Sequence, residues 1–354
     1  MRIVEIYLSL KSPAIITERR TEHGFKSIDE YIPSSTVRGA ILASLYYHGL
    51  VDKATLERER ENPSLICTPA YPLINGHKAW PSHPFLFKCK ACEDFLNLSE
   101  ESLRKLEDGL PPPIRLSCEQ GHACLQPLYP GIYSKNPGMK RQKFYSVCVG
   151  INKKRASCEA EMLWEYDAIA AGQQFWTMAI LPDDLPIEKI EECWIGRGIS
   201  RGFGRCEIKT EEQDEEEEIE RTKNAAKNGR IVLYAISPLL SLSEGLSFPY
   251  PQEINLDEVG RRYGLQGGGK LTVEAIYGRS TILDTGWDMA RGEKRPTFWG
   301  SAHSGTVLVA RWSSEICWEA LTVLRVSGTV EKMGNFVITG INQLTPLRDH
   351  EVTK

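Results

Sequence analysis

Two pairs of cysteines limit how the stretch of chain around them can fold. Two residues separate Cys89 from Cys92, five separate Cys118 from Cys124, and 25 lie between the two pairs. Four thiolates on two short turns suit a closed tetrahedral zinc site, which we predict here in preference to free buried cysteines or a catalytic metal. His122 lies within the second pair and is an alternative to one thiolate. Zinc binding would supply much of the folding free energy of this segment.

The remaining cysteines are scattered along the chain and are expected to be packing residues. The opening MRIVEIYLSL alternates polar with apolar residues, unlike a signal peptide, and no run of about 18 apolar residues could cross a bilayer. Without an export signal, clustered cysteines indicate metal binding rather than disulfides. We therefore expect a soluble, cytoplasmic protein. The scattered cysteines are Cys67, Cys148, Cys158, Cys193, Cys206 and Cys317.

Most of the acidic excess of the chain lies in one short segment. The chain of 354 residues has 43 Lys and Arg against 47 Asp and Glu, a formal net charge of -4. Residues 211–220, EEQDEEEEIE, hold eight of those acidic groups, so the remainder of the chain is mildly basic. With 41% hydrophobic and 25% charged residues, the sequence can form a packed core, and its length fits two domains.

The order of expected elements indicates an α+β protein of two ferredoxin-like (RRM-like) domains. A β-α-β-β-α-β order is predicted for residues 1–210, with a zinc-binding insertion over about 62–138 that is rich in proline and poor in regular periodicity. Residues 211–229 are expected to form an acidic linker, either a solvated helix or disordered chain. Residues 230–354 begin again with a strand and are assigned to the second domain.

Several individual elements can be predicted from their residue patterns. The alternating start predicts a strand over residues 2–17, and the segment Gln174–Leu181 predicts another. A helix is expected to begin at Ser34 or Ser35. A short helix is expected over residues 186–196. The apolar face of the first helix would comprise Val37, Ile41 and Leu45, and would extend to Tyr46.

A glycine-rich and arginine-rich loop precedes the last predicted strand of the first domain. The sequence is GRGISRGFGR, residues 196–205. Its glycines allow positive φ angles and close approach of a ligand, while its arginines are spaced four residues apart and donate well to phosphate oxygens. The spacing differs from a dinucleotide fingerprint, and the loop leads into a strand. A phosphodiester backbone is the predicted ligand; the alternative is a glycine-rich turn with solvated arginines.

The start of the first helix has a second possible anion site. In IPSSTVRG, residues 32–39, Ser34, Ser35 and Thr36 place hydroxyls and unpaired N–H groups where an anion is favoured, and Arg38 adds positive charge. The alternative is a capped helix that binds no ligand.

Together these motifs resemble those of the RAMP superfamily, the repeat-associated proteins of CRISPR effector complexes. IPSSTVRGAILASLY is similar to the family's helix start, and GRGISRGFGRCEI is similar to its glycine-rich loop. A third stretch, from Gly286-Trp287 through Lys294-Arg295-Pro296 to Ser304-Gly305-Thr306-Val307, resembles the GW...PK...GS-V pattern of the subunits that cap the 5′ end of the guide RNA. Ser34 replaces the glycine that is usual in the family. Ala302 and His303, the two residues before the last motif, are also unusual for the family.

The resemblance is greatest to the type III-D subunit of the handle-binding group. It implies a non-catalytic subunit of an antiviral type III ribonucleoprotein that holds the 5′ handle of the guide RNA (crRNA). It also implies contact with the large polymerase-like subunit and with backbone RAMP subunits. The RNA contacts implied by these motifs are Ser35, Arg38, Arg197, Arg201 and Arg205, with Gly198, Gly202 and Gly204 allowing close approach.

A further single-strand surface is predicted between Arg279 and Trp299. Here basic residues are interleaved with Trp287, Phe298 and Trp299, a mixture typical of surfaces that stack bases. Core aromatic residues flanked by surface charge would give the same pattern. The predicted RNA contacts in this tract are Arg291, Lys294 and Arg295.

Two alternative functions remain open at this stage. The first is a metal-independent endoribonuclease of the same superfamily that matures guide RNA, for which His23, His48 and His303 are candidate acids or bases. Nothing in the sequence pairs these histidines. The second is a protein-only assembly adaptor whose basic loops meet acidic protein surfaces. Residues 264–270 match part of a P-loop, but the order of the expected elements is reversed, so no nucleotide site is predicted there.

Overall fold

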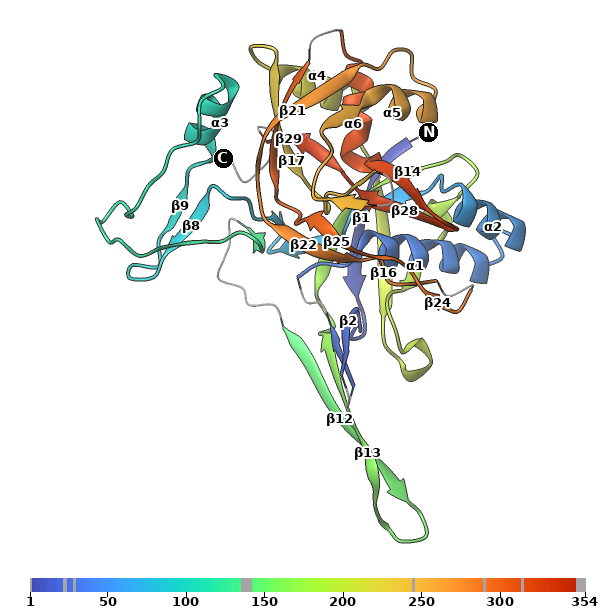
Figure 1. The fold of residues 1–354 in the computed structure, drawn as a ribbon. Helices are drawn as coiled ribbons and strands as arrows, with labels where there is room; N and C mark the ends of the chain where they lie inside the picture. Colours follow the sequence, from blue (N-terminus) through green and yellow to red (C-terminus); the bar gives the residue numbers. More distant parts are fainter. Residues whose placement is uncertain are drawn as a thin grey trace.

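The computed structural model describes residues 2–21, 24–27, 30–134, 142–243, 246–288, 291–312 and 315–347. Two antiparallel sheets with helices packed against them form the body of the molecule, and two long extensions project from it (Figure 1). The mixed α and β class predicted from the sequence is confirmed. No helix in the described ranges is both long enough and apolar enough to cross a bilayer.

The first sheet has the strand order β15-β16-β1-β14-β5-β6, and β4 also pairs with β14. Alternation along β1 buries Val4, Ile6 and Leu8 on the face that α1 covers, because apolar residues two apart share one face of a strand. The predicted helix face is confirmed for Val37, Ile41 and Leu45, which all belong to the same core cluster, but it is wrong for Tyr46, which is 43% exposed. The strands are β1 (Arg2–Leu10), β4 (Ile66–Cys67), β5 (Tyr71–Ile74), β6 (His77–Lys78), β14 (Gln174–Leu181), β15 (Glu192–Trp194) and β16 (Arg205–Glu212). The helices are α1 (Ser34–Tyr47), α2 (Lys53–Glu61) and the 3₁₀ turns η1 (Ile187–Lys189) and η2 (Ile199–Arg201).

The second sheet has the strand order β20-β21-β26-β17-β29. In chain order its first strand, β17, lies between the last strand, β29, and the fourth, β26. The first sheet has the same arrangement, because β1 lies between β16 and β14. The elements are β17 (Arg230–Ala235), β20 (Glu253–Asn255), α5 (Leu256–Tyr263), β21 (Lys270–Tyr277), β26 (Val307–Trp312), α6 (Trp318–Ser327) and β29 (Leu344–Pro346). Four short two-stranded ladders surround this sheet: β18 (Ser241–Ser243) with β19 (Leu246–Phe248), β22 (Ser280–Asp284) with β25 (Thr297–Ala302), β23 (Trp287–Asp288) with β24 (Glu293–Lys294), and β27 (Thr329–Met333) with β28 (Phe336–Ile341).

One apolar core joins the two sheets. Tyr71, Trp176 and Met178 of the first sheet belong to the same buried cluster as β17, β26 and α6. Buried polar groups also cross the boundary: the Tyr71 hydroxyl donates to the carbonyl of Ile236, and Gln343 Nε2 donates to the carbonyl of Cys67 at 2.9 Å. The two halves therefore hold each other in a fixed orientation.

The cysteine-containing stretch forms a projecting unit, but it begins later than predicted. Residues 66–74, which the sequence assigns to the insertion, pair with β14 as β4 and β5 and belong to the first sheet. The prediction of a boundary near residue 62 is wrong because these strands are short and contain proline, which hides their alternation. The later elements are β7 (Trp80–Pro81), β8 (Leu86–Cys89), β9 (Phe95–Asn97), α3 (Ser99–Glu107), β10 (Leu125–Pro127) and β11 (Ile132–Tyr133). We call residues 86–127 the arm; it projects to the left in Figure 1.

A long hairpin forms the second extension, pointing downward in Figure 1. Its strands belong to a separate four-stranded sheet with the order β12-β13-β3-β2. The sequence predicts strands here but not a separate projecting sheet. Several large apolar side chains of the hairpin are exposed, including Tyr145, Val147 and Ile151. The strands are β2 (Thr17–Thr21), β3 (Gly24–Ser27), β12 (Lys143–Asn152) and β13 (Ser157–Ile169).

The acidic run continues β16 and then forms a helix. Helix α4 (Glu215–Asn224) is capped by Asp214, whose side chain accepts hydrogen bonds from the N–H groups of Glu216 and Glu217. Of the two alternatives for this run, the helix is observed. Contrary to the expectation of full solvation, α4 packs on α6, where Thr222 is buried and Arg325 pairs with Glu218.

Candidate metal centre and nucleic-acid interface

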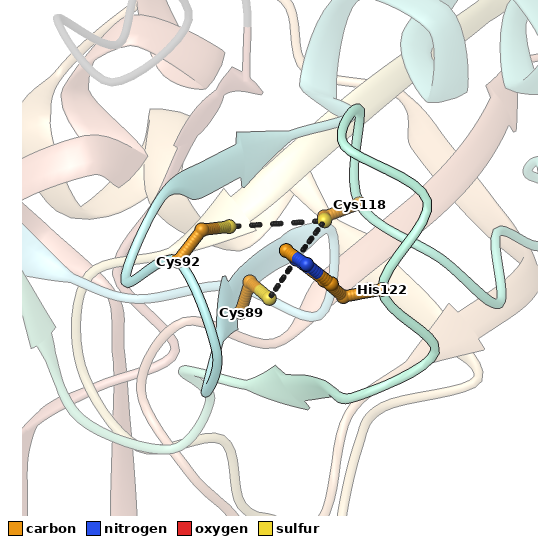
Figure 2. A group of neighbouring side chains, drawn as sticks. All are labelled: Cys89, Cys92, Cys118 and His122. Carbon is orange, nitrogen blue, oxygen red and sulfur yellow. Dashed lines mark hydrogen bonds between the residues drawn. The ribbon is translucent and has the colours of Figure 1, made fainter.

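The arm brings three cysteines and a histidine together. Donor atoms of Cys89, Cys92, Cys118 and His122 all lie within 4.8 Å of one another (Figure 2). Cys89 ends β8, and Cys92 follows in the turn before β9. The other two ligands come from the chain that returns from α3 to β10. This cluster could hold a metal ion.

The distances in the cluster fit a tetrahedral site. Zinc–sulfur bonds of about 2.3 Å give sulfur atoms about 3.8 Å apart at the corners of a tetrahedron. Cys92 Sγ lies 3.7 Å from Cys118 Sγ. His122 Nδ1 lies 3.5 Å from Cys118 Sγ and 3.9 Å from Cys89 Sγ. The donor set and its dimensions therefore suit zinc.

Cys124 lies beside the cluster rather than within it. Its Sγ is 3.3 Å from Cys89 Sγ, but Cys124 is not among the four residues whose donor atoms all lie within 4.8 Å of one another. The structure thus groups His122, which the sequence offered as an alternative, with the first three cysteines. Backbone N–H groups of Cys92 and Ala91 point at Cys89 Sγ, and they lower the pKa of the Cys89 thiol to about 6, as expected of a turn that stabilises a thiolate.

The glycine-rich loop requires glycine at several positions. Gly196, Gly198, Gly202 and Gly204 all have positive φ, between 79° and 86°. A Cβ on Gly204 would lie 2.1 Å from the carbonyl oxygen of Ile195, whereas one on Gly202 would meet nothing within 4 Å. Gly204 is therefore needed for packing, and Gly202 keeps an open surface beside Arg201.

The loop arginines differ in their surroundings. Arg201 is exposed and lies over the ring of Tyr166, with its guanidinium carbon 5.6 Å from the ring centroid, and it also donates to the Tyr166 hydroxyl. Arg197 is exposed, and its backbone N–H donates to the carbonyl of Ile15. Arg205 makes two hydrogen bonds to Glu192, of 3.0 and 2.6 Å. Arg197 and Arg201 are thus both exposed on this surface, and Arg205 is paired with a carboxylate.

The root of the long hairpin completes this surface. Phe203 of the loop packs against Phe144 and Tyr166 of the hairpin, with ring centroids 6.1 and 5.4 Å away. Tyr166 and Phe144 were not predicted as site residues. The alternating aromatic residues in β12 and β13 indicate strands, but nothing in the sequence shows which loop those strands contact.

At the start of α1, the two predicted contacts have different environments. Ser35 is exposed in the first turn, whereas its neighbour Ser34 is buried and donates to the carbonyl of Cys67. Arg38 donates to the carbonyl of Leu65 at 2.7 Å and to the carboxylate of Glu59 at 2.9 Å. Because the Glu59 side chain has no exposed surface, Arg38 acts in this structure as the partner of a buried charge.

In the second predicted basic tract, between Arg279 and Trp299, some basic side chains are exposed and others are partly buried. Arg295 donates to the carbonyl of Val337. Burial lowers the pKa of its guanidinium. The negative charge of Asp288 partly offsets this effect, and the positive charge of Arg38 adds to it. Arg291 donates to the carbonyl of Asn335. Lys294 is exposed and lies 3.1 Å from a carboxylate oxygen of Asp284.

The aromatic residues of the same tract also divide. Trp287 and Trp299 are exposed, while Phe298 belongs to a buried cluster with Leu240 and Ile338. The expectation that all three aromatic residues face a single strand is therefore wrong for Phe298. Its neighbours in the strand alternate between the two faces, so it packs inside.

The GS-V element has a packing role. Gly305 has a φ of 88°, and a Cβ there would lie 1.9 Å from the carbonyl oxygen of Ser82. Thr306 shares a hydrogen bond of 2.9 Å with the Tyr129 hydroxyl. These contacts hold the base of the arm against the second sheet.

The candidate catalytic histidines are not brought together within the described ranges. His48 is exposed at the end of α1, and His303 is half-buried beside Tyr129. Burial and the nearby Arg279 lower the pKa of His303. His23 lies outside the described residues.

Comparison with known proteins finds similarity only at the level of structure. No protein-family model matches the chain, and no curated protein matches it. Two cryo-EM structures contain chains with a similar fold: the type III-B Cmr-beta complex bound to cognate target RNA and AMPPnP, with a TM-score of 0.52, and the same complex bound to cognate target RNA, with a TM-score of 0.51. In each case the identity is 11%, and the match covers 86% of this chain and 86% of the other. The chain therefore shares its fold with a component of a type III CRISPR complex.

Proposed function

We propose that this chain is a non-catalytic guide-RNA-binding subunit of a type III CRISPR antiviral ribonucleoprotein. The observation that carries the proposal is the loop of residues 196–204, where positive-φ glycines present Arg197 and Arg201 beside the aromatic root of the hairpin. Guanidinium groups bind phosphate oxygens, and an exposed ring such as Phe144, which is 36% exposed, can stack on a base, so the two together suit single-stranded RNA.

The shared fold supports the same assignment. The matched Cmr-beta chains come from complexes bound to target RNA, and the match extends over most of both chains rather than over one motif. In both sheets the first strand in the chain lies inside the sheet, beside the last one, which supports two ferredoxin-like domains in tandem. In this proposal the subunit is of the type III-D handle-binding kind, and it contacts the large polymerase-like subunit and a backbone RAMP subunit.

Zinc is the proposed metal of the arm, with a structural role. Cys89, Cys92, Cys118 and His122 would supply all four positions of a tetrahedral site, which leaves none open for a substrate. A bound zinc ion would hold the two turns of the arm together.

We also propose that this chain does not cleave RNA. Cleavage of RNA without metal needs an acid and a base within reach of one phosphodiester. In the described ranges, His48 and His303 lie in unrelated environments, one exposed and one half-buried between the arm and the second sheet. Purified protein is expected to leave repeat RNA intact. Cleavage that is abolished by His48→Ala or His303→Ala would instead support the endoribonuclease.

The experiment that tests RNA binding is reconstitution of the complex with Arg197→Ala/Arg201→Ala. We expect guide RNA to be lost while the protein subunits still assemble. Unchanged guide RNA would contradict the role of the loop. Loss of protein subunits with RNA retained would favour the assembly adaptor.

A further inference from the structure

An apolar segment of the arm extends into solvent. Residues 110–117 connect the end of α3 to Cys118, and they include some of the most exposed large apolar side chains of the described chain. Leu110 is 54% exposed, Ile114 is 88% exposed and Leu116 is 80% exposed. A single exposed apolar residue needs no explanation, but several in one short segment indicate a surface that is covered by a partner.

The segment has the pattern of an unpaired edge strand. Ile114 and Leu116 are two residues apart, so in extended chain they lie on the same side. Arg115, between them, donates to a carboxylate oxygen of Glu101 on α3 at 3.2 Å. Within the described part of the chain, no main-chain group of residues 111–117 forms a main-chain hydrogen bond. Its N–H and carbonyl groups are therefore available to a partner.

Both ends of the segment are held in place. On one side, Leu103 and Leu106 of α3 are buried in the main core. On the other side, Cys118 belongs to the metal cluster. Three consecutive prolines, residues 111–113, stiffen the chain between these anchors. Because the segment is already ordered, little conformational entropy would be lost when a partner binds it.

The charge of the arm indicates which class of partner it meets. Residues 86–127 contain five Lys or Arg against seven Asp or Glu, so the arm is slightly acidic. A polyanion would be repelled, whereas a protein with apolar pockets and basic residues around them would be attracted. Strand addition to an open sheet edge uses the same two features, free main-chain groups and side chains on one face.

We propose that residues 114–117 dock on a neighbouring protein subunit of the complex, by adding a strand to an open sheet edge while Ile114 and Leu116 enter apolar pockets. The identity of the assembly rests on the proposed function. The docking surface is inferred independently, from the exposed apolar side chains, from the main-chain groups that make no main-chain hydrogen bond, and from the acidic charge of the arm. The metal centre then serves to hold a protein-docking element in position.

A photo-crosslinking amino acid at position 114 or 116 tests this inference in the assembled complex. The matched control is position 104 on α3, where the Arg104 side chain is 77% exposed on the same arm. Crosslinks from positions 114 and 116 to one protein subunit, absent from position 104, are the expected result. Crosslinks to RNA, or none at either position in an intact complex, would overturn the proposal.

Ile114→Asp/Leu116→Asp provides a second measurement. Both substitutions replace an apolar side chain, buried on docking, with a charged one, so we expect binding of that subunit to weaken by at least about tenfold. Guide RNA and metal content should stay unchanged. Unaltered subunit affinity overturns the docking surface and leaves the RNA function standing. A complex that crosslinks as expected but contains no guide RNA contradicts the RNA function alone.

Discussion

At the scale of single residues, similar arginines in the predicted site do different things. Arg201 reaches an aromatic surface, Arg205 is paired with an exposed carboxylate, and Arg38 compensates a carboxylate with no exposed surface. A sequence motif specifies that an arginine is present but not which carboxylate lies beside it. Glu59 lies 21 residues after Arg38, so its partnership depends on how α2 packs.

Replacing Arg38 is predicted to affect folding more than RNA binding. Arg38→Ala leaves the Glu59 carboxylate buried without a partner, which costs about 3–5 kcal/mol of unfolding free energy. Denaturant titration measures the loss. Arg38→Ala/Glu59→Ala should be less destabilised than Arg38→Ala alone. An unchanged stability together with a specific loss of RNA affinity would show that Arg38 is an RNA contact after all.

His83 is predicted to make stability depend on pH. Its side chain is fully buried, and burial lowers its pKa to about 3, so the unfolded chain binds a proton near the ordinary value of 6.5 while the folded chain does not. Stability should therefore fall as the pH drops from about 6.5 toward 3, by up to about 1.4 kcal/mol per pH unit from this group. Urea titrations at pH 7 and pH 5 measure the change. His83→Gln should show a smaller decrease, and an equal decrease in both proteins would refute the assignment.

At the scale of elements, the arm is predicted to depend on a bound metal ion. We expect about one zinc per chain by elemental analysis, and Cys89→Ser, Cys118→Ser or His122→Ala should each reduce it strongly, because each removes one of four ligands. Cys124→Ser is the comparison variant, since Cys124 is not one of the four residues of the cluster, and it should retain zinc. If Cys124→Ser loses the metal and His122→Ala retains it, the ligand set is four cysteines instead.

The sequence predicts regular elements well and irregular ones poorly. Alternation identified β14 with its observed bounds, and a 3.6-residue period identified the buried face of α1. The helix expected over residues 186–196 is instead the short turn η1 followed by β15, because only one turn of helix forms before the chain becomes extended. The short strands β4 and β5 were missed, since pairing with β14 rather than local pattern makes them strands.

At the scale of the whole molecule, the predicted order of elements agrees with a first strand that lies inside each sheet, but it does not indicate the core that the two sheets share. Tyr71 and Gln343 cross between the halves through buried hydrogen bonds that neither segment's own pattern indicates. The same limit applies to the site. The loop arginines and the cysteine pairs were identifiable, whereas Tyr166 joins the loop only after folding brings the hairpin to it.

RNA affinity measured as a function of salt tests the central claim most directly. Arg197→Ala/Arg201→Ala is compared with Arg104→Ala/Lys53→Ala, which removes the same charge from side chains that are 77% and 80% exposed elsewhere. If the loop holds the RNA backbone, the loop variant binds single-stranded repeat RNA more weakly, and the slope of log affinity against log salt falls in magnitude by about 1.4, for two phosphate contacts. The control keeps the slope of the unmodified protein. Equal affinities and equal slopes for the two variants would contradict the account.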